Sequence, residues 1–525
     1  MARMFGRRAS PLLALCVPAL LCGCAVGPDF VKPSAPGVSG YTPEPLAGET
    51  ASASVADGAA QRFVAGLDIP GQWWRLFHSE ALSALIAEAL KVNPNLQAAQ
   101  SALQVAQENV AAQQGAYYPS VSGNFSASRQ KNPTAVLSPT LTSGSPYFNL
   151  FTPQLSVSYV PDVFGLNRRT VEGLVAQAEA QRYALAATYL TLTSNVAAAA
   201  VQEAGLRGQI KATEDIIALE RELLELFRVQ LSKGQIAEVD VAAQEAALAA
   251  AETALPPLQK QLAQQRDLLA ALTGRFPSEV PGETFELSGL ELPQELPLSL
   301  PAQVVEQRPD VLQAEANLHQ ASAAIGVAVA NRLPNLTLSA GVGTTAAQAN
   351  RLFTTGTGFW SIAASLTQPI FDGGTLLHKE RAARAAFEQS VAEYRATVIT
   401  AMQNVADSLR ALQYDAEALK AAAHAETTAA RSLELVRAQL RLGAVNYLAL
   451  LNAQTAYQQA VIGLVQAQAA RLADTAALFQ ALGGGWWNPP PAPESEGAAT
   501  AGMREENPAG DRGWLLDAVA RPFGF

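Results

Sequence analysis

The segment Tyr118-Pro119-Ser120-Val121-Ser122-Gly123-Asn124-Phe125-Ser126-Ala127-Ser128 alternates apolar or glycine positions with small polar ones. A period of two predicts a β-strand with one apolar face and one polar face. The polar face carries serine and asparagine rather than charge, which is typical of a membrane-barrel strand of about 9–11 residues. A half-buried strand of a soluble sheet shows the same alternation, so this segment alone leaves both interpretations open.

Three further segments alternate in the same way, at residues 154–159, 335–342 and 360–367. Polar stretches separate the paired strands at roughly 129–152 and 346–358, where we expect loops. Aromatic residues gather near the expected strand ends: Tyr117, Tyr118, Tyr147, Phe148, Phe151, Phe164, Phe359, Trp360 and Phe371. An aromatic girdle at the membrane interface has this distribution, which favours the membrane interpretation.

Four strands cannot close a barrel, and an open sheet edge in lipid leaves unpaired backbone groups at a cost of several kcal/mol each. The chain is therefore expected to oligomerise and to share its strands with other copies. An eight-stranded barrel is filled by its own side chains, whereas larger barrels keep a lumen. If the strands serve a conduit, a trimer is the smallest solution.

An internal duplication organises the rest of the chain. Matching pairs occur in the same order in both halves: 93–96 with 308–311, 118–120 with 333–335, 163–165 with 370–372, and 230–234 with 439–443. The two copies end at Thr273-Gly274 and Leu482-Gly483, where glycine is well suited to cap a helix.

Each copy is expected to contain one very long helix and one shorter returning helix. Proline is absent and glycine is sparse from about Arg169 to Lys233 and from about Thr375 to Leu442. At 1.5 Å per residue, each stretch gives a rod on the order of 100 Å, which does not fit a compact globule. Gly234 and Gly443 are expected to mark the hairpin turns, and the long helices to form a bundle or tube.

The N-terminus carries a predicted export signal. Arg3, Arg7 and Arg8 precede a short apolar run, residues 11–21. Residues 21–24, Leu-Cys-Gly-Cys, resemble a bacterial lipobox, which implies cleavage before Cys24 and acylation of its thiol and new amino group. Ala25 in the next position implies sorting to the outer membrane. The alternative is an ordinary signal peptide with incidental cysteines.

Several classes of function are disfavoured by composition. The net charge of −10 argues against nucleic-acid binding. The sequence has no internal run of 18 apolar residues, which argues against a membrane-spanning helix. The four histidines, His78, His319, His378 and His424, lack the spacing of metal ligands. No cofactor motif or catalytic arrangement stands out, so we expect no enzyme activity. Four tryptophans, Trp73, Trp74, Trp486 and Trp487, are expected to pack around the helices rather than to bind a ligand.

Three motifs together resemble the lipoprotein branch of the TolC-type outer-membrane efflux proteins: residues 24–30, 73–77 and 93–96. The resemblance extends to about residue 485. It implies a mixed α and β membrane protein, a homotrimer with a twelve-stranded β-barrel in the outer membrane, and a twelve-helix tube in the periplasm. It also implies two partners, a periplasmic adaptor protein and an inner-membrane transporter, usually of the proton-driven RND type.

In this family the hairpin tips form the periplasmic aperture. By resemblance, Gly234 and Asp240 belong to the first tip, and Gly443, Val445, Ala449 and Asn452 belong to the second. Relatives often carry aspartates at the positions of Ala449 and Asn452, and some carry a basic latch residue at that of Val445. The acidic rings are therefore expected to be missing. For Asp240, a gating role and a plain helix-start charge both remain open.

The domain organisation expected from these features begins with a signal peptide, 1–23, and an extended lipidated segment, 24–72. The two repeats follow at 73–274 and 306–485, separated by a linker, 275–305, and the chain ends in a disordered tail, 486–525. The predicted function is a passive outer-membrane conduit for small toxic compounds. A conduit for secreted proteins and a lipid-anchored coiled coil without a pore are the alternatives.

Overall fold

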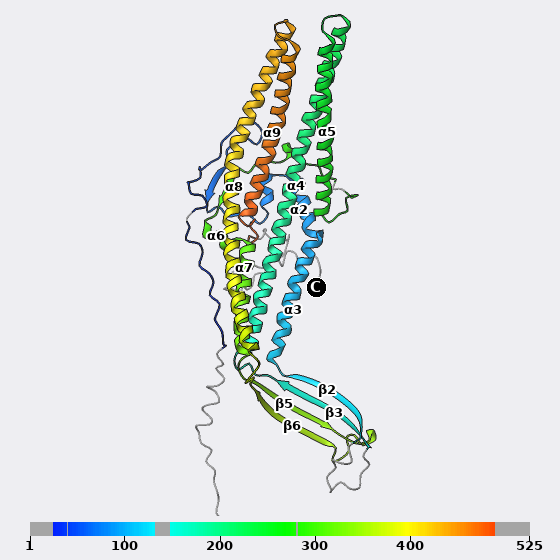
Figure 1. Ribbon diagram of the computed structural model, residues 1–525, viewed down its shortest axis with the longest axis vertical. Helices are drawn as coiled ribbons and strands as arrows, with labels where there is room; N and C mark the ends of the chain where they lie inside the picture. The colour runs from blue at the N-terminus through cyan, green and yellow to red at the C-terminus, as the bar shows by residue number, and fades with distance from the viewer. Residues whose placement is uncertain (1–24, 39, 132–146, 280–281, 489–525) are drawn as a thin grey trace, which may run out of the picture. The chain divides into compact units, whose positions relative to one another are not determined.

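The computed structural model describes residues 25–38, 40–131, 147–279 and 282–488, and these divide into two compact units. The strand unit contains residues 25–33, 102–131, 147–181 and 314–394. The hairpin unit contains the other described residues. The predicted Cys24 and the expected tail beyond residue 488 lie outside the described residues. Figure 1 labels most of the helices and the larger strands of both units.

The strand unit is built on a four-stranded antiparallel sheet with the order β2-β3-β5-β6. Its strands are β2 (Ser120–Lys131), β3 (Tyr147–Tyr159), β5 (Asn335–Thr344) and β6 (Gly358–Thr367), as Figure 1 shows. Every one of the four predicted strands is present. The loop expected at 129–152 is wrong in its bounds, because Arg129 pairs with Asn149 and Lys131 pairs with Tyr147. Backbone pairing continues there although the alternation of side chains has ended.

The apolar face of this sheet is exposed in the single chain. Val121 and Phe125 on β2 are 68% and 63% exposed, and Trp360 and Ile362 on β6 are 75% and 78% exposed. Small residues hold the opposite face, where the hydroxyls of Ser122 and Ser156 lie 3.4 Å apart. Among the described residues, the outer edges of β2 and β6 have no partner strand.

A strap of residues 25–33 is clamped to helices α4 (Leu166–Ser232) and α7 (Pro309–Ala330) within the strand unit. The side chain of Arg169 is almost fully buried, and it bonds Asp29 at 2.7 Å and Glu172 at 2.8 Å. The ring of His319 stacks on Phe30 at 4.3 Å and bonds Glu172 at 3.1 Å. The strap thus packs on the unit with a defined geometry.

The hairpin unit contains most of the helical residues. Helix α4 turns back into α5 (Glu238–Leu272), and α8 (Thr375–Arg441) turns back into α9 (Tyr447–Ala481). The two long helices have 67 residues each and the two returning helices have 35 residues each, so the copies match in length. These helices agree with the predicted hairpins to within a few residues.

Shorter elements surround the helices of this unit: η1 (Trp73–Phe77), α2 (Glu80–Val92), η4 (Leu287–Gly289) and α6 (Pro301–Gln307). Strand β1 (Arg62–Ala65) pairs in parallel with β4 (Glu295–Leu298), which joins the N-terminal segment to the predicted linker. Helix α3 (Pro94–Gln114) ends in η2 (Gly115–Tyr117), and η5 (Ala349–Arg351) lies between β5 and β6 in the strand unit.

Trp73, Trp74 and Trp486 are buried, as expected for packing residues, and Trp73 stacks on Phe479 at 5.3 Å. The indole of Trp486 donates to the carbonyl of Gln307 at 2.7 Å. Trp486 therefore belongs to the packed hairpin unit, and the boundary expected at 486 for the tail is too early.

Among the described residues, one helix, α4, contains a window apolar enough to cross a membrane by length and composition. However, 67% of that window is buried inside the structure, where alanine, leucine and valine pack against neighbouring helices. Burial in a protein core explains this apolar composition without a membrane span.

A carboxyl pair on α8 and α9 makes the stability of the hairpin unit depend on pH. Burial, a hydrogen bond with Asp415 and the charge of Asp415 raise the pKa of Asp474 to about 7. Since Asp474 keeps its proton in the fold but loses it on unfolding, the free energy of unfolding falls as pH rises from about 3.8 to about 7. We expect Asp474→Asn to flatten this decline.

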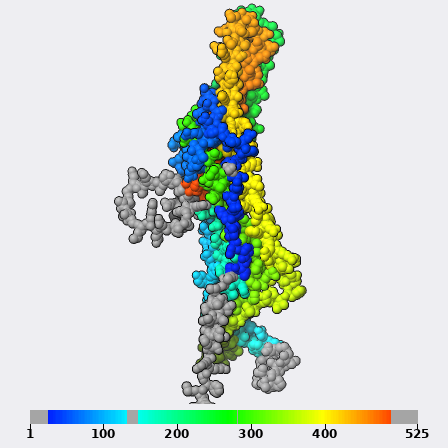
Figure 2. Space-filling model, turned by 90° about the vertical axis from the view of Figure 1, so that its left-hand side faces the viewer, coloured from blue at the N-terminus to red at the C-terminus, as the bar shows by residue number. Residues whose placement is uncertain are grey.

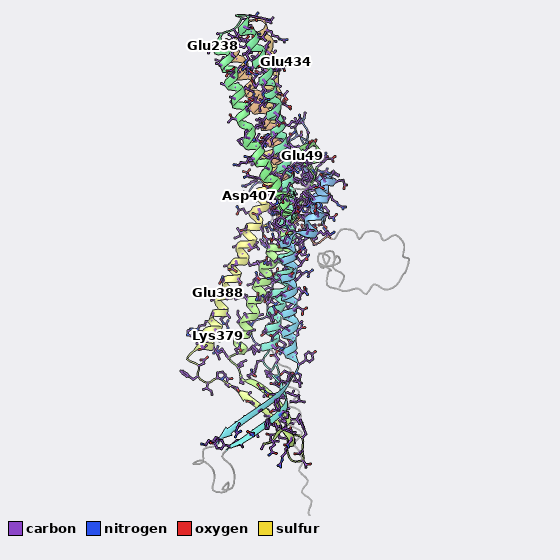
Figure 3. All side chains as sticks on the ribbon, turned by 90° about the vertical axis from the view of Figure 1, so that its right-hand side faces the viewer. Glu49, Glu238, Lys379, Glu388, Asp407 and Glu434 are labelled. Atoms are coloured by element: carbon purple, nitrogen blue, oxygen red, sulfur yellow. The ribbon has the colours of Figure 1, made fainter. Side chains whose placement is uncertain are left out.

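Thermal unfolding of the purified protein across this pH range measures the effect. Asp407→Asn is the matched control, because Asp407 is an exposed carboxylate on α8, the helix that carries the partner Asp415 (Figure 3). A decline of equal slope in the Asp474→Asn variant and in the wild type would contradict the assignment.

Candidate functional site at the hairpin tips

The two hairpin turns have the same backbone geometry. The amide of Gln235 donates to the carbonyl of Gln230 at 3.0 Å, and the amide of Ala444 donates to that of Gln439 at 2.9 Å. Both are Schellman caps, which need a left-handed residue just past the helix. Gly234 and Gly443 supply it, with φ angles of 69° and 72°. A side chain would find open space at either glycine, so backbone conformation is what requires glycine there.

Side chains from both hairpins join in one hydrophobic cluster behind the turns, and Figure 2 shows the orange α9 region beside the green α5 region at this end. Phe227 of α4 is 1% exposed, and its ring lies 4.3 Å from that of Tyr447, the first residue of α9. The buried members are Leu224, Phe227, Val241, Leu433, Leu450 and Ala453. The tips of one chain are therefore held together mainly by apolar packing.

A polar bond crosses the same contact. The hydroxyl of Tyr447 donates to Oε1 of Gln230 at 2.5 Å. Burial and the nearby charge of Asp240 raise the pKa of Tyr447, which keeps the hydroxyl protonated and able to donate. Neither Tyr447 nor Gln230 was assigned a role from the sequence, although Gln230 lies in the repeated turn motif and Tyr447 follows shortly after its second copy.

A second polar layer lies further along the hairpins. Glu220 of α4 is 1% exposed and accepts from the amide of Gln458 of α9 at 2.9 Å and from that of Gln244 of α5. Burial raises the pKa of Glu220, while the hydrogen bond from Gln244 and the charge of Arg437 oppose that shift. Residues from all four hairpin helices thus meet around one buried carboxyl group.

Asp240 and Ala449 are the third residues of α5 and α9, so they occupy equivalent positions in the two copies. The carboxylate of Asp240 accepts from the backbone amide of Ala237 at 3.1 Å, and it therefore caps its own helix. In the second copy Asn446 caps the helix, because its Oδ1 accepts from the backbone amide of Ala449 at 3.1 Å. Each helix start has one polar cap, placed at a different position.

The remaining predicted tip residues, Val445 and Asn452, belong to the second hairpin. Val445 is half-buried in the turn, and Asn452 is exposed on α9. Glu238 and Glu434 are acidic residues near the same tips, as Figure 3 shows, and both are exposed. Acidic charge is therefore present at this end of the unit, at positions that the family resemblance did not indicate.

Potential metal ligands are not grouped into a site in the part of the chain that the structure describes. No group of three or more His, Cys, Asp or Glu side chains is placed there to hold a metal ion. Of the four histidines, His319 belongs to the strap contact and His78 lies 3.2 Å from Glu291.

The comparisons with known proteins agree with this architecture. The chain matches the family described as outer membrane efflux protein twice, over residues 85–275 and 300–484. The chain belongs to the outer membrane efflux protein family. The two matched ranges each contain one strand pair and one helical hairpin, in accordance with the duplication seen in the sequence.

This efflux protein is 30% identical over 502 residues to the toluene efflux pump outer membrane protein TtgC of Pseudomonas putida, covering 95% of this chain and 99% of the relative. It is 27% identical over 479 residues to the cation efflux system protein CusC of Escherichia coli, covering 90% and 98%. The solved structure of the outer-membrane channel OprN is similar with a TM-score of 0.78 and 25% identity, covering 88% of this chain and all of that one.

Proposed function

We propose that three copies of this efflux protein form a passive conduit across the outer membrane, the exit duct of a tripartite pump. The four-stranded sheet carries the proposal, because its apolar face is exposed and its β2 and β6 edges are unpaired. Joining β6 of one chain to β2 of the next satisfies these edges and turns the apolar face to lipid. Three chains then contribute twelve strands, enough for a lumen.

The long hairpins would continue this barrel as a twelve-helix tube in the periplasm, with the tips as its aperture. Acylation of Cys24 would anchor each chain to the membrane, and the strap would carry the chain from that anchor to α4 and α7. We place Gly234, Asp240, Gly443, Val445, Ala449 and Asn452 at the aperture. A periplasmic adaptor and an inner-membrane transporter of the RND type would be the partners, and the transporter would supply the energy. The protein itself would catalyse no reaction.

The cargo we propose is small toxic compounds, such as drugs, dyes or aromatic solvents. The toluene pump of the relative TtgC supports this cargo, whereas the cation system of CusC shows that related channels serve different cargoes. Deletion of the gene in its host is expected to increase accumulation of a fluorescent dye, and re-expression to reverse it. A secretion defect without a change in dye accumulation would indicate a protein conduit. Absence of channels in planar bilayers would indicate a protein without a pore.

The missing acidic rings have a measurable consequence. Carboxylate rings at a constriction attract cations. Because residues 449 and 452 are alanine and asparagine in this chain, we expect the wild-type channel to be weakly cation-selective and little blocked by multivalent cations. The double substitution Ala449→Asp and Asn452→Asp is expected to raise the cation selectivity of the channel and its block by multivalent cations in single-channel recordings.

The control for this experiment is Ala449→Asn, which adds a polar side chain of the size of aspartate but without its charge. Strong cation block in the wild-type channel would show that other groups, such as Glu238, create an acidic ring at the aperture.

A further inference from the structure

The turn after β6 presents two bare apolar side chains. Ile370 is 94% exposed and Phe371 is 92% exposed. The turn itself is well ordered by hydrogen bonds, since the carboxylate of Asp372 accepts from the amides of Gly374 at 2.9 Å and Leu376 at 2.7 Å. Two large apolar side chains left exposed on a hydrogen-bonded turn indicate an interaction surface.

The duplicated turn in the first repeat shows what such a pair contacts. Val163 and Phe164 correspond to Ile370 and Phe371, and both are half-buried. They line a concavity of about 480 Å³ in the strand unit, together with residues of the segment that leads into the start of β5. Leu333, Pro334 and Leu336 of that segment line the concavity as well. Thus the first-repeat turn faces the second-repeat strand start within one chain.

The first-repeat equivalent of that strand start is uncovered. With the prolines of the two copies aligned, Leu333, Pro334 and Leu336 correspond to Tyr118, Pro119 and Val121. Tyr118 is 74% exposed and Val121 is 68% exposed, whereas Leu333 and Leu336 are half-buried. Each chain therefore carries both halves of a second contact. One half lies at the start of β2 and the other just after the end of β6, the two outermost strands of the sheet, which do not pair with each other.

We propose that Ile370 and Phe371 of one chain pack against Tyr118, Pro119 and Val121 of a second copy. This contact repeats between chains the one that Val163 and Phe164 make within a chain. A head-to-tail interface of this kind closes into a ring when the rotation between copies allows it. The inference rests on the proposed trimer, and it adds a specific docking site next to the β6–β2 junction.

The same two turns also differ in one respect. In the first repeat the strap adds to the contact, because the amide of Val26 donates to the carbonyl of Phe164 at 3.1 Å. Each chain has one strap, so the contact between chains relies on the apolar side chains alone. Substitution at Phe371 is therefore expected to weaken association between chains without disturbing the fold of one chain.

Thiol cross-linking in the full-length protein tests the proposal. A chain with Phe371→Cys and Tyr118→Cys, treated with a short bismaleimide in membranes, is expected to give covalent species of two and three chains. Mixing chains that carry only Phe371→Cys with chains that carry only Tyr118→Cys is expected to give dimers alone. The wild-type chain, whose cysteines are Cys16, Cys22 and Cys24, provides the background.

Two controls fix the interpretation. Phe164→Cys with Leu333→Cys is expected to link within one chain and to leave the mass unchanged. Thr355→Cys with Tyr118→Cys is expected to give no link, because Thr355 precedes β6 at the opposite end of that strand.

Amine cross-linking of the wild-type protein tests the proposed trimer separately from the docking site. If it reports trimers but the Phe371/Tyr118 pair does not link, the docking site is overturned and the proposed function stands. If it reports monomers only, both are overturned. Phe371→Ser gives a second readout: its trimers are expected to dissociate at a lower temperature in detergent than those of Thr355→Ser. Equal dissociation temperatures would also overturn the docking site.

Discussion

Ile362→Lys is expected to prevent stable assembly of the protein in the outer membrane. Ile362 lies in the middle of β6 and is 78% exposed on the apolar face of the sheet. A lysine facing lipid near the membrane midplane costs about 2–4 kcal/mol per chain. We expect loss of detergent-resistant trimers and a reduced amount of protein in the outer-membrane fraction.

Ser361→Lys is the matched control because neighbouring residues of a strand point to opposite faces. Ser361 pairs with Gly341 on the polar face, and its side chain is exposed. Assembly of the Ser361→Lys variant is expected to be close to that of the wild type. Equal loss in both variants would contradict the assignment of the lipid face.

Phe227→Ala is expected to loosen the hairpin tips. Phe227 is 1% exposed and packs on Tyr447 at 4.3 Å, and removal of a buried phenylalanine ring costs about 3–5 kcal/mol. If the tips form the aperture, the variant is expected to show larger or more frequent openings in single-channel recordings and faster amide exchange in residues 224–241.

The neighbouring Leu226→Ala is the control, since Leu226 is 49% exposed and is expected to change little. Tyr447→Phe separates the hydroxyl from the ring, because it removes only the bond to Gln230, worth about 0.5–1.5 kcal/mol. Similar openings in the Phe227→Ala and Leu226→Ala channels would show that packing at this cluster does not control the aperture.

Periodicity predicted the elements well because it follows directly from local geometry. The alternation after Pro119 and Pro334 corresponds to β2 and β5, and the proline-free stretches correspond to α4 and α8. The glycines at 234 and 443 mark the ends of helices, since few other residues adopt a left-handed conformation without strain. The strand bounds at 131 and 147 were missed because backbone pairing there does not need alternating side chains.

The chemistry of the tips was predicted less completely. The resemblance predicted that Asp240 is an acid at the aperture, and that role stays a prediction; in the structure its carboxylate accepts from the backbone amide of Ala237. It did not indicate the bond between Tyr447 and Gln230 or the buried Glu220. The bonded residues Tyr447 and Gln230 are 217 residues apart along the chain, and Gln458 and Glu220 are 238 residues apart, so no local pattern encodes these contacts.

By itself, the sequence determined the duplication, the four strands, the long hairpins and the family, because each of these depends on residue order and local conformational preference. Tertiary structure alone decided which side chains meet. It paired Phe227 with Tyr447 at the tips, and it left Ile370 and Phe371 bare while their counterparts Val163 and Phe164 are half-buried. The physical reason is that burial depends on the neighbours that folding brings close, and corresponding motifs in the two repeats have different neighbours in a single chain.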